Sequence, residues 1–153
     1  MIKEINFLKL NENAVTPSKG TPYSVGYDLT ATSIRYDSEY DFLEYGTGIA
    51  VEIPDGYACL LAPRSSVTKK GLFLANSVGV GDPDYRGELT FRYKSHSLPL
   101  KQYKYIPRGK IYEVGERIGQ LLIVKVENLF VFIEQDELSE TVRGEGGYGS
   151  TGK

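Results

Sequence analysis

Two strand-like runs meet at a turn in Thr47-Gly-Ile-Ala-Val-Glu-Ile-Pro-Asp-Gly-Tyr-Ala-Cys-Leu-Leu-Ala62, the stretch that decides the fold class of this chain. Apolar residues dominate positions 47–53 and 57–62, and the triplet Pro54-Asp55-Gly56 separates them. β-Branched and aromatic residues favour strands, whereas proline, aspartate and glycine together favour a tight turn. The stretch therefore predicts two short strands joined by a turn.

The same alternation of short apolar runs and turn residues extends over all 153 residues, and long helical periodicity is absent. Seventeen glycines and seven prolines supply the many turns that short strands require. We expect one all-β domain, a sandwich, jelly roll or barrel, with one short helix from Ser66 to about Gly71 capped by Ser65 or Ser66. The expected strands are residues 2–8, 27–31, 47–53, 57–62, 89–93, 110–114, 120–126 and 130–133.

Composition argues against several classes of function. A formal net charge of −2 gives no basic surface for nucleic acid or for an anionic membrane. The single cysteine, Cys59, lies in an apolar run, so we expect a small buried side chain in a protein of a reducing compartment, the cytoplasm. No segment is long and apolar enough to predict a membrane span. The lone His96 has no Cys/His cluster beside it, so a zinc site is not expected.

The segment from Ala62 to Gly71 contains candidate phosphate-binding groups. Its predicted strand ends at a proline, and serines then open the short helix. Unpaired N–H groups at a helix start favour phosphate oxygens, and Arg64 and Ser65 add a charged and a neutral donor. Ordinary helix capping by the serines is the alternative interpretation.

The segment from Asn76 to Gly87 predicts a β-turn at Asp82-Pro-Asp-Tyr85 between the arms of a hairpin. Its glycines at 79, 81 and 87 would let a ligand approach the backbone, whose alternating N–H and C=O groups match the edge of uracil and reject cytosine. Asp82 could orient a water molecule, and Asp84 could equally cap the turn. A surface turn without a ligand is the alternative.

Two polar residues interrupt apolar strands. Asp28 lies within an apolar run, where an unpaired carboxylate is costly, so it needs a cationic or metal-linked partner unless it faces solvent at a strand edge. Gln120 begins another apolar run. Its side chain could be a hydrogen-bonded amide in the core, an edge residue or a contact to phosphate.

The C-terminal Arg143-Gly-Glu-Gly-Gly-Tyr-Gly-Ser-Thr-Gly152 is half glycine and cannot form a core of its own. It combines backbone N–H groups, a guanidinium group and an aromatic ring, which suits an arm that folds over a phosphorylated ligand. We expect a β-domain over residues 1–142 and a flexible arm over 143–153, with a disordered tail as the alternative.

These five segments, in this order, resemble the five sequence motifs of the trimeric dUTP pyrophosphatase (dUTPase) family. They are residues 26–31, 63–71, 76–87, 117–121 and 143–152. The resemblance implies a distorted β jelly roll or barrel that assembles as a homotrimer with active sites at subunit interfaces. It also implies Mg²⁺-dependent hydrolysis of dUTP to dUMP and pyrophosphate, in the cytoplasm or in the host cytoplasm for a viral source.

The resemblance implies a role for each site residue. Asp82 would position the water that attacks the α-phosphorus, and Asp28 would reach the metal through a water. The substrate-binding residues would be Arg64, Ser65, Ser66 and Gln120 at the phosphates, Asn76, Gly79, Val80, Gly81 and Tyr85 at deoxyuridine, and Arg143, Tyr148, Gly149, Ser150 and Thr151 in the arm.

Residues 94–110 form a longer link between the third and fourth motifs than the family usually has. The link holds five basic residues and no acid, and we expect a solvated loop. A docking surface for another protein, or a contact at the rim of the trimer, is the alternative. For the whole chain, the alternatives to a dUTPase are a dCTP deaminase of similar fold and a non-catalytic scaffold that binds a nucleotide or a partner.

Overall fold

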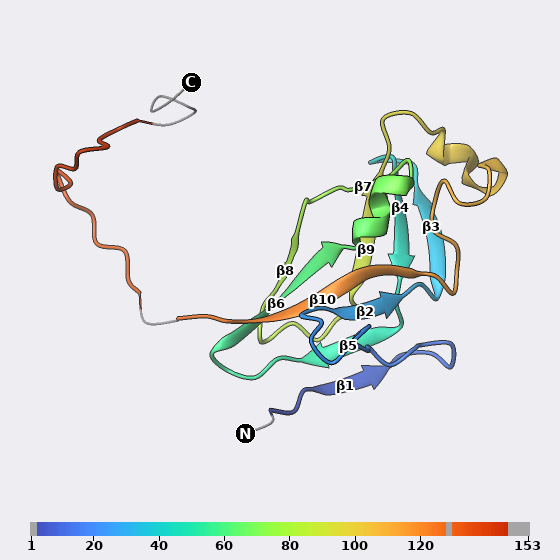
Figure 1. The fold of residues 1–153 in the computed structure, drawn as a ribbon, viewed down its shortest axis with the longest axis horizontal. Coiled ribbons are helices and arrows are strands. Elements are labelled where there is room, and N and C mark those ends of the chain that lie inside the picture. Colours follow the sequence, from blue (N-terminus) through green and yellow to red (C-terminus); the bar gives the residue numbers. More distant parts are fainter. Residues whose placement is uncertain (1–2, 128–129, 147–153) are drawn as a thin grey trace.

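The computed structural model describes residues 3–127 and 130–146, and strands dominate its regular structure (Figure 1). The elements of these residues are β1 (Asn6–Lys9), β2 (Tyr27–Thr30), β3 (Ser33–Asp37), β4 (Phe42–Gly46), β5 (Ile49–Glu52), β6 (Tyr57–Pro63), η1 (Ser65–Lys69), β7 (Phe73–Leu74), β8 (Gly79–Gly81), β9 (Thr90–Lys94), η2 (Leu100–Tyr105) and β10 (Arg117–Lys125), where η denotes a 3₁₀-helix.

Strand pairing divides these strands into three antiparallel sheets, with the orders β1-β5, β2-β10-β6-β8 and β3-β4-β9-β7. The all-β prediction is confirmed, but the strands described here form open sheets and no closed barrel. The predicted turn is present, because the N–H of Tyr57 donates to the C=O of Pro54 at 3.1 Å and Gly56 has a φ of 76°. It leads the chain from the first sheet into the second.

The strand predictions were right wherever apolar residues run together and incomplete elsewhere. Six of the eight predicted segments contain a strand, whereas residues 110–114 and 130–133 contain none. The expected strands did not include β3, β4, β7 or β8, although β8 lies where one arm of the expected hairpin was placed. β4, β7 and β8 pair with strands that are not their neighbours along the chain, so local pattern alone did not identify them. β3 pairs only with β4, which follows it.

The helix prediction needs two corrections. The short helix after β6 is present as η1, but Arg64 is its N-cap residue and neither serine caps it. It ends at Lys69, two residues before Gly71. A second 3₁₀-helix, η2, lies in the link that was expected to be a solvated loop, and it buries Leu100.

Three tyrosines form the centre of the core. Tyr45, Tyr93 and Tyr112 are buried, with ring centroids 5.8 Å apart for Tyr45 and Tyr93 and 5.4 Å apart for Tyr93 and Tyr112. The Tyr45 hydroxyl donates to the C=O of Tyr112, and the Tyr93 hydroxyl donates to the C=O of Ile118. The first bond ties the irregular segment before β10 to the third sheet, and the second ties β10 itself to that sheet. The first bond helps to hold residues 110–114 in place although they form no strand.

Two further single residues that the sequence analysis discussed can be placed in the structure. Cys59 is buried, and burial raises the pKa of its thiol. His96 stacks on Phe73 with ring centroids 4.5 Å apart. None of the helices in the described part of the chain has the length and hydropathy needed to cross a membrane.

The C-terminal segment leaves the body of the molecule after β10 and runs away from it (Figure 1). Its described part, residues 130–146, contains no helix or strand. Large apolar side chains of the segment are exposed, including Phe130 at 80% and Phe132 at 105%. A segment of this composition gains little by remaining in water, so its apolar side chains need a covering surface.

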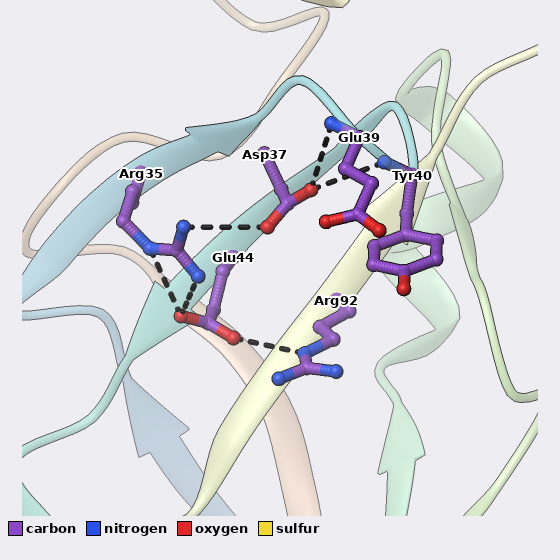
Figure 2. A network of polar contacts seen from close by, with 6 residues as sticks. All are labelled: Arg35, Asp37, Glu39, Tyr40, Glu44 and Arg92. Atoms are coloured by element: carbon purple, nitrogen blue, oxygen red, sulfur yellow. Dashed lines mark hydrogen bonds and ion pairs between the residues drawn. The ribbon is translucent and has the colours of Figure 1, made fainter.

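A charged network covers the outer face of the third sheet (Figure 2). Glu44 of β4 accepts from Arg35 on β3 and from Arg92 on β9, both at 2.8 Å. Asp37 accepts from the Arg35 guanidinium group at 3.3 Å and also from backbone N–H groups of the turn that follows. Burial raises the pKa of Glu44, but the hydrogen bonds and charges of Arg35 and Arg92 together lower it below its usual 4.5.

Because the folded-state pKa of Glu44 is depressed, its ionisation stabilises the fold above the unfolded-state pKa. That stabilisation is lost as the pH falls through the folded-state value. Glu44→Gln should lower the free energy of unfolding by about 1 kcal/mol at pH 7. It should also remove part of the decrease in that free energy that we expect as the pH falls below ~4.5. Chemical denaturation from pH 7 to pH 3 measures both effects. An unchanged pH profile would contradict the role given to Glu44.

Candidate active site

The side chain of Asp28 is a buried charge on β2, with only 8% of it exposed. Its Oδ1 accepts from Nε of Arg64 at 3.0 Å, and its Oδ2 accepts from Nη1 of Arg117 at 2.9 Å. The prediction that Asp28 needs a cationic partner is confirmed, and the solvent-facing alternative is excluded. Two charge-assisted hydrogen bonds offset the cost of removing the carboxylate from water.

The sheet register explains why these three residues meet. β10 lies between β2 and β6, and Gln120 is opposite Asp28 on one side and Ala62 on the other. Arg64 follows the end of β6, and Arg117 begins β10. Both guanidinium groups therefore reach the same carboxylate from different strands.

Arg64 retains donors for a ligand. Nε is the only atom of its guanidinium group with a hydrogen bond to a described residue, so both Nη groups are available. Ser65 and Ser66 follow in the first turn of η1, and no side-chain capping bond to a described residue engages them. A guanidinium group beside two hydroxyls suits phosphate oxygens.

Gln120 lies in the middle of β10, not at the start of the strand as the sequence predicted. Its side chain crosses to Gly26, where an added Cβ would lie 2.7 Å from Oε1. The absence of a side chain at Gly26 therefore lets the amide lie close to the start of β2, beside the Asp28 cluster.

Sequence reasoning missed two residues of this cluster. It quoted Arg117 within a motif but gave it no role, although a cation at the start of an apolar strand was a usable signal. Tyr112 gave no signal; its buried hydroxyl lies near Ser66 and Arg64 and finds no hydrogen-bond partner among the described residues. Burial raises the pKa of Tyr112 above its usual value, and the neighbouring Ser66 and Arg64 offset part of that rise.

A second polar group surrounds the predicted turn. The N–H of Tyr85 donates to the C=O of Asp82 at 3.1 Å, which confirms the turn. The hairpin prediction is wrong, because β8 pairs with β6 and the residues after the turn form no strand with it. Asp82, Asp84 and Asn76 are exposed to solvent.

Protein side chains occupy the space beside the glycines of this segment. Added Cβ atoms would collide with Sγ of Cys59 at Gly81 and with the Tyr85 ring at Gly87, and at Gly79 one would lie 3.1 Å from Leu61. The glycines thus permit close packing inside the chain, and their role in the approach of a ligand stays a prediction. The outer edge of β8 faces no other described strand, and its Val80 is 67% exposed.

The carboxylates of the two groups lie apart within one chain, although Gly79 of β8 pairs with Leu61, three residues before Arg64. Asp28 lies on the first strand of the second sheet and Gly81 on the fourth, which separates them by three strand spacings, about 14 Å. The described C-terminal segment, residues 130–146, runs away from the body of the molecule (Figure 1), and within it Nε of Arg143 donates to the C=O of Gly146 at 2.9 Å. The predicted residues Tyr148, Gly149, Ser150 and Thr151 lie outside the described residues.

Carboxylates are sparse around both groups. In residues 3–127 and 130–146, no three His, Cys, Asp or Glu side chains come together as a metal-binding group. Asp28 has spare lone pairs, since each carboxylate oxygen accepts one guanidinium bond. This donor set fits an ion that is held by phosphate oxygens and water, as Mg²⁺ usually is, with Asp28 contacting a water molecule.

Comparison with known proteins identifies a family. Residues 12–152 match the family model described as dUTPase. The deoxyuridine 5'-triphosphate nucleotidohydrolase of Escherichia phage T5 is 36% identical, with 95% of this chain and 97% of the relative covered. That of Hydrogenobaculum sp. is 39% identical, with 94% of each covered.

Solved structures agree. The dUTPase of Staphylococcus bacteriophage 80alpha, solved with dUPNHPP, is 28% identical and superposes with a TM-score of 0.78. The superposition covers 99% of this chain and all of that one.

Asp28→Asn should lower the free energy of unfolding by about 2 kcal/mol, because it removes the charge that both arginines contact. The matched control is Asp55→Asn, since Asp55 is exposed in the 54–57 turn and forms no ion pair with a described residue. Chemical denaturation of both variants measures the difference. Equal stabilities would show that the Asp28 cluster does not hold the sheet.

Proposed function

This chain belongs to the dUTPase family and is a dUTP nucleotidohydrolase, and we propose that it releases pyrophosphate from dUTP at sites shared between the protomers of a homotrimer. The separation of its two polar groups on one sheet carries the proposal. The group around Asp28 offers cations and hydroxyls, and the group around Asp82 offers a carboxylate and a backbone edge. Neither group is a complete site alone.

The first group binds the triphosphate. The Nη groups of Arg64 and the hydroxyls of Ser65 and Ser66 donate to phosphate oxygens, and Gln120 assists from the neighbouring strand. Asp28 and Arg117 act indirectly, because their ion pairs fix the direction in which the Arg64 fork points. A fork held in place loses less entropy when the substrate binds.

The second group binds deoxyuridine. The outer edge of β8, from Gly79 through Val80 to Gly81, presents N–H and C=O groups to uracil, with Asn76 beside it. An added Cβ on Gly79 would lie 3.6 Å from Nδ2 of Asn76, so the amide lies next to this edge. Cytosine would leave one of these polar groups unpaired, which is an effective form of discrimination.

Tyr85 forms the sugar platform. Its hydroxyl donates to the C=O of Glu88 at 3.1 Å, and its ring packs on Gly87. The side of the ring away from Gly87 remains open, since Tyr85 is 49% exposed. Deoxyribose packs against this open side, and a 2′-hydroxyl would be left without a partner there.

Asp82 orients the attacking water towards the α-phosphorus. Its position at the exposed end of β8 places it beside the bound nucleoside. Orientation of this kind converts a random encounter into an in-line approach. Mg²⁺, when bound on the triphosphate, neutralises charge that develops during the transfer.

The C-terminal arm, residues 143–153, closes the site. Arg143 and the Ser150-Thr151 pair contact the terminal phosphates, Gly149 allows the close approach and Tyr148 stacks on the base. The segment before the arm crosses to a neighbouring protomer, and its exposed Phe130 and Phe132 are covered there. A cytoplasmic location, or the host cytoplasm for a viral chain, suits this nucleotide substrate.

Asp82→Asn should reduce kcat for pyrophosphate release from dUTP by about 10²- to 10⁴-fold while KM changes little, since the water loses its orienting base. Asp84→Asn is the matched control, because Asp84 is exposed on the same turn. Assays with dUTP, dCTP, dTTP and UTP, with and without Mg²⁺, measure both variants. Equal losses in both variants would remove Asp82 from the chemistry, and ammonia release from dCTP by the unmodified protein would favour a deaminase.

Subunit mixing tests the shared site. Asp82→Asn and Arg64→Gln chains should each be nearly inactive alone. Random mixed trimers should regain about a quarter of the unmodified activity, since a quarter of the sites then combine two intact groups. Co-refolding the two variants and assaying dUTP hydrolysis measures the recovery. No recovery in trimers that are shown by mass to be mixed would place the whole site within one chain.

A further inference from the structure

Residues 94–110 form a folded projection with an apolar underside; we call them the basic insert. Leu100 is buried at 2%, and Tyr103 and Ile106 pack against the core. Leu98 fills the space beside Gly71. The hydroxyl of Ser95 accepts from the backbone N–H groups of two following residues, which fixes the start of the projection. The basic insert is therefore a rigid surface and not a solvated loop.

The outer side of the basic insert carries its charge. Its side chains include five cations and no acid, and four of the cations are exposed. Only Arg108 forms an ion pair with a described residue, Glu113, at 3.3 Å. Tyr105 stands among these cations and is 87% exposed. The exposed cations are Lys101, Lys104, Arg108 and Lys110.

The C-terminal segment carries the opposite charge. Residues 134–140, which we call the acidic segment, hold four carboxylates and no cation. All seven residues are exposed, and no carboxylate among them forms an ion pair with a described residue. Leu138 adds an apolar side chain that is 89% exposed. The carboxylates are Glu134, Asp136, Glu137 and Glu140.

We propose that the acidic segment of one protomer docks on the basic insert of another protomer in the same trimer. Within one chain the two surfaces lie at opposite ends of the molecule (Figure 1), so the partner is a second copy. Four exposed carboxylates against four exposed cations, with Leu138 and Tyr105 as exposed apolar side chains, give charge and apolar complementarity at once. This docking rests on the proposed trimer. It directs the C-terminal arm, which follows the acidic segment, towards the active site of a neighbouring protomer.

Charge reversal on both sides tests the docking. Lys101→Glu with Lys104→Glu should lower kcat/KM for dUTP about fivefold at low salt, and Glu134→Lys with Glu137→Lys should do the same. The quadruple variant should recover most of the loss. The control adds Glu12→Lys and Glu39→Lys to the insert variant, which restores the net charge at exposed positions outside the acidic segment and should not rescue activity.

Zero-length carbodiimide crosslinking supplies a second readout. Trimers mixed from isotopically light and heavy chains should give peptides that join Lys101 or Lys104 of one chain to residues 134–140 of another. Absence of such peptides, together with full activity of the insert variant, would overturn the docking while leaving the hydrolase assignment intact. A loss of activity that the quadruple variant fails to recover would also overturn it and would point to a partner other than this chain. An unmodified protein that is monomeric or does not hydrolyse dUTP would instead refute the proposed function.

Discussion

The carboxylate of Asp28, held between Arg64 and Arg117, is the interaction on which the active site depends. A carboxylate that is only 8% exposed is tolerable here because each of its oxygens accepts a charge-assisted hydrogen bond from a guanidinium group, at 3.0 Å and 2.9 Å. The same two bonds join three strands of the second sheet and direct one guanidinium fork outwards. The two ion pairs of Asp28 thus serve both the stability of the sheet and the proposed binding of phosphate.

The other parts of the site supply groups that the Asp28 cluster lacks. The Asp82 turn and the open edge of β8 lie at the other side of the sheet, where they offer a nucleoside partner but no cation for phosphates. The exposed apolar segment that begins at Phe130 adds a third incomplete surface. Open edges and uncovered apolar side chains favour association, so the same features that leave one chain incomplete favour assembly.

Local chemistry predicted the parts of the fold that depend on neighbouring residues. The turns at residues 54–57 and 82–85 are present because proline and aspartate set the backbone in both, with a glycine in the first. β3 and β4 were missed because they contain charged positions, among them Arg35 and Glu44, that pair with each other between the two strands. The helix η2 was missed because its one buried side chain, Leu100, finds its apolar partners elsewhere in the chain.

The sequence by itself determined the chemical inventory: an all-β chain, a buried aspartate in need of a cation, a turn with an exposed carboxylate, and five family motifs. Only the tertiary structure decided that the cations are Arg64 and Arg117, that glycines 79, 81 and 87 serve internal packing, and that the two polar groups stand apart. The physical reason is the register of antiparallel strands. It pairs residues as far apart as Tyr27 and Leu121, and no local propensity encodes which strand lies next to which.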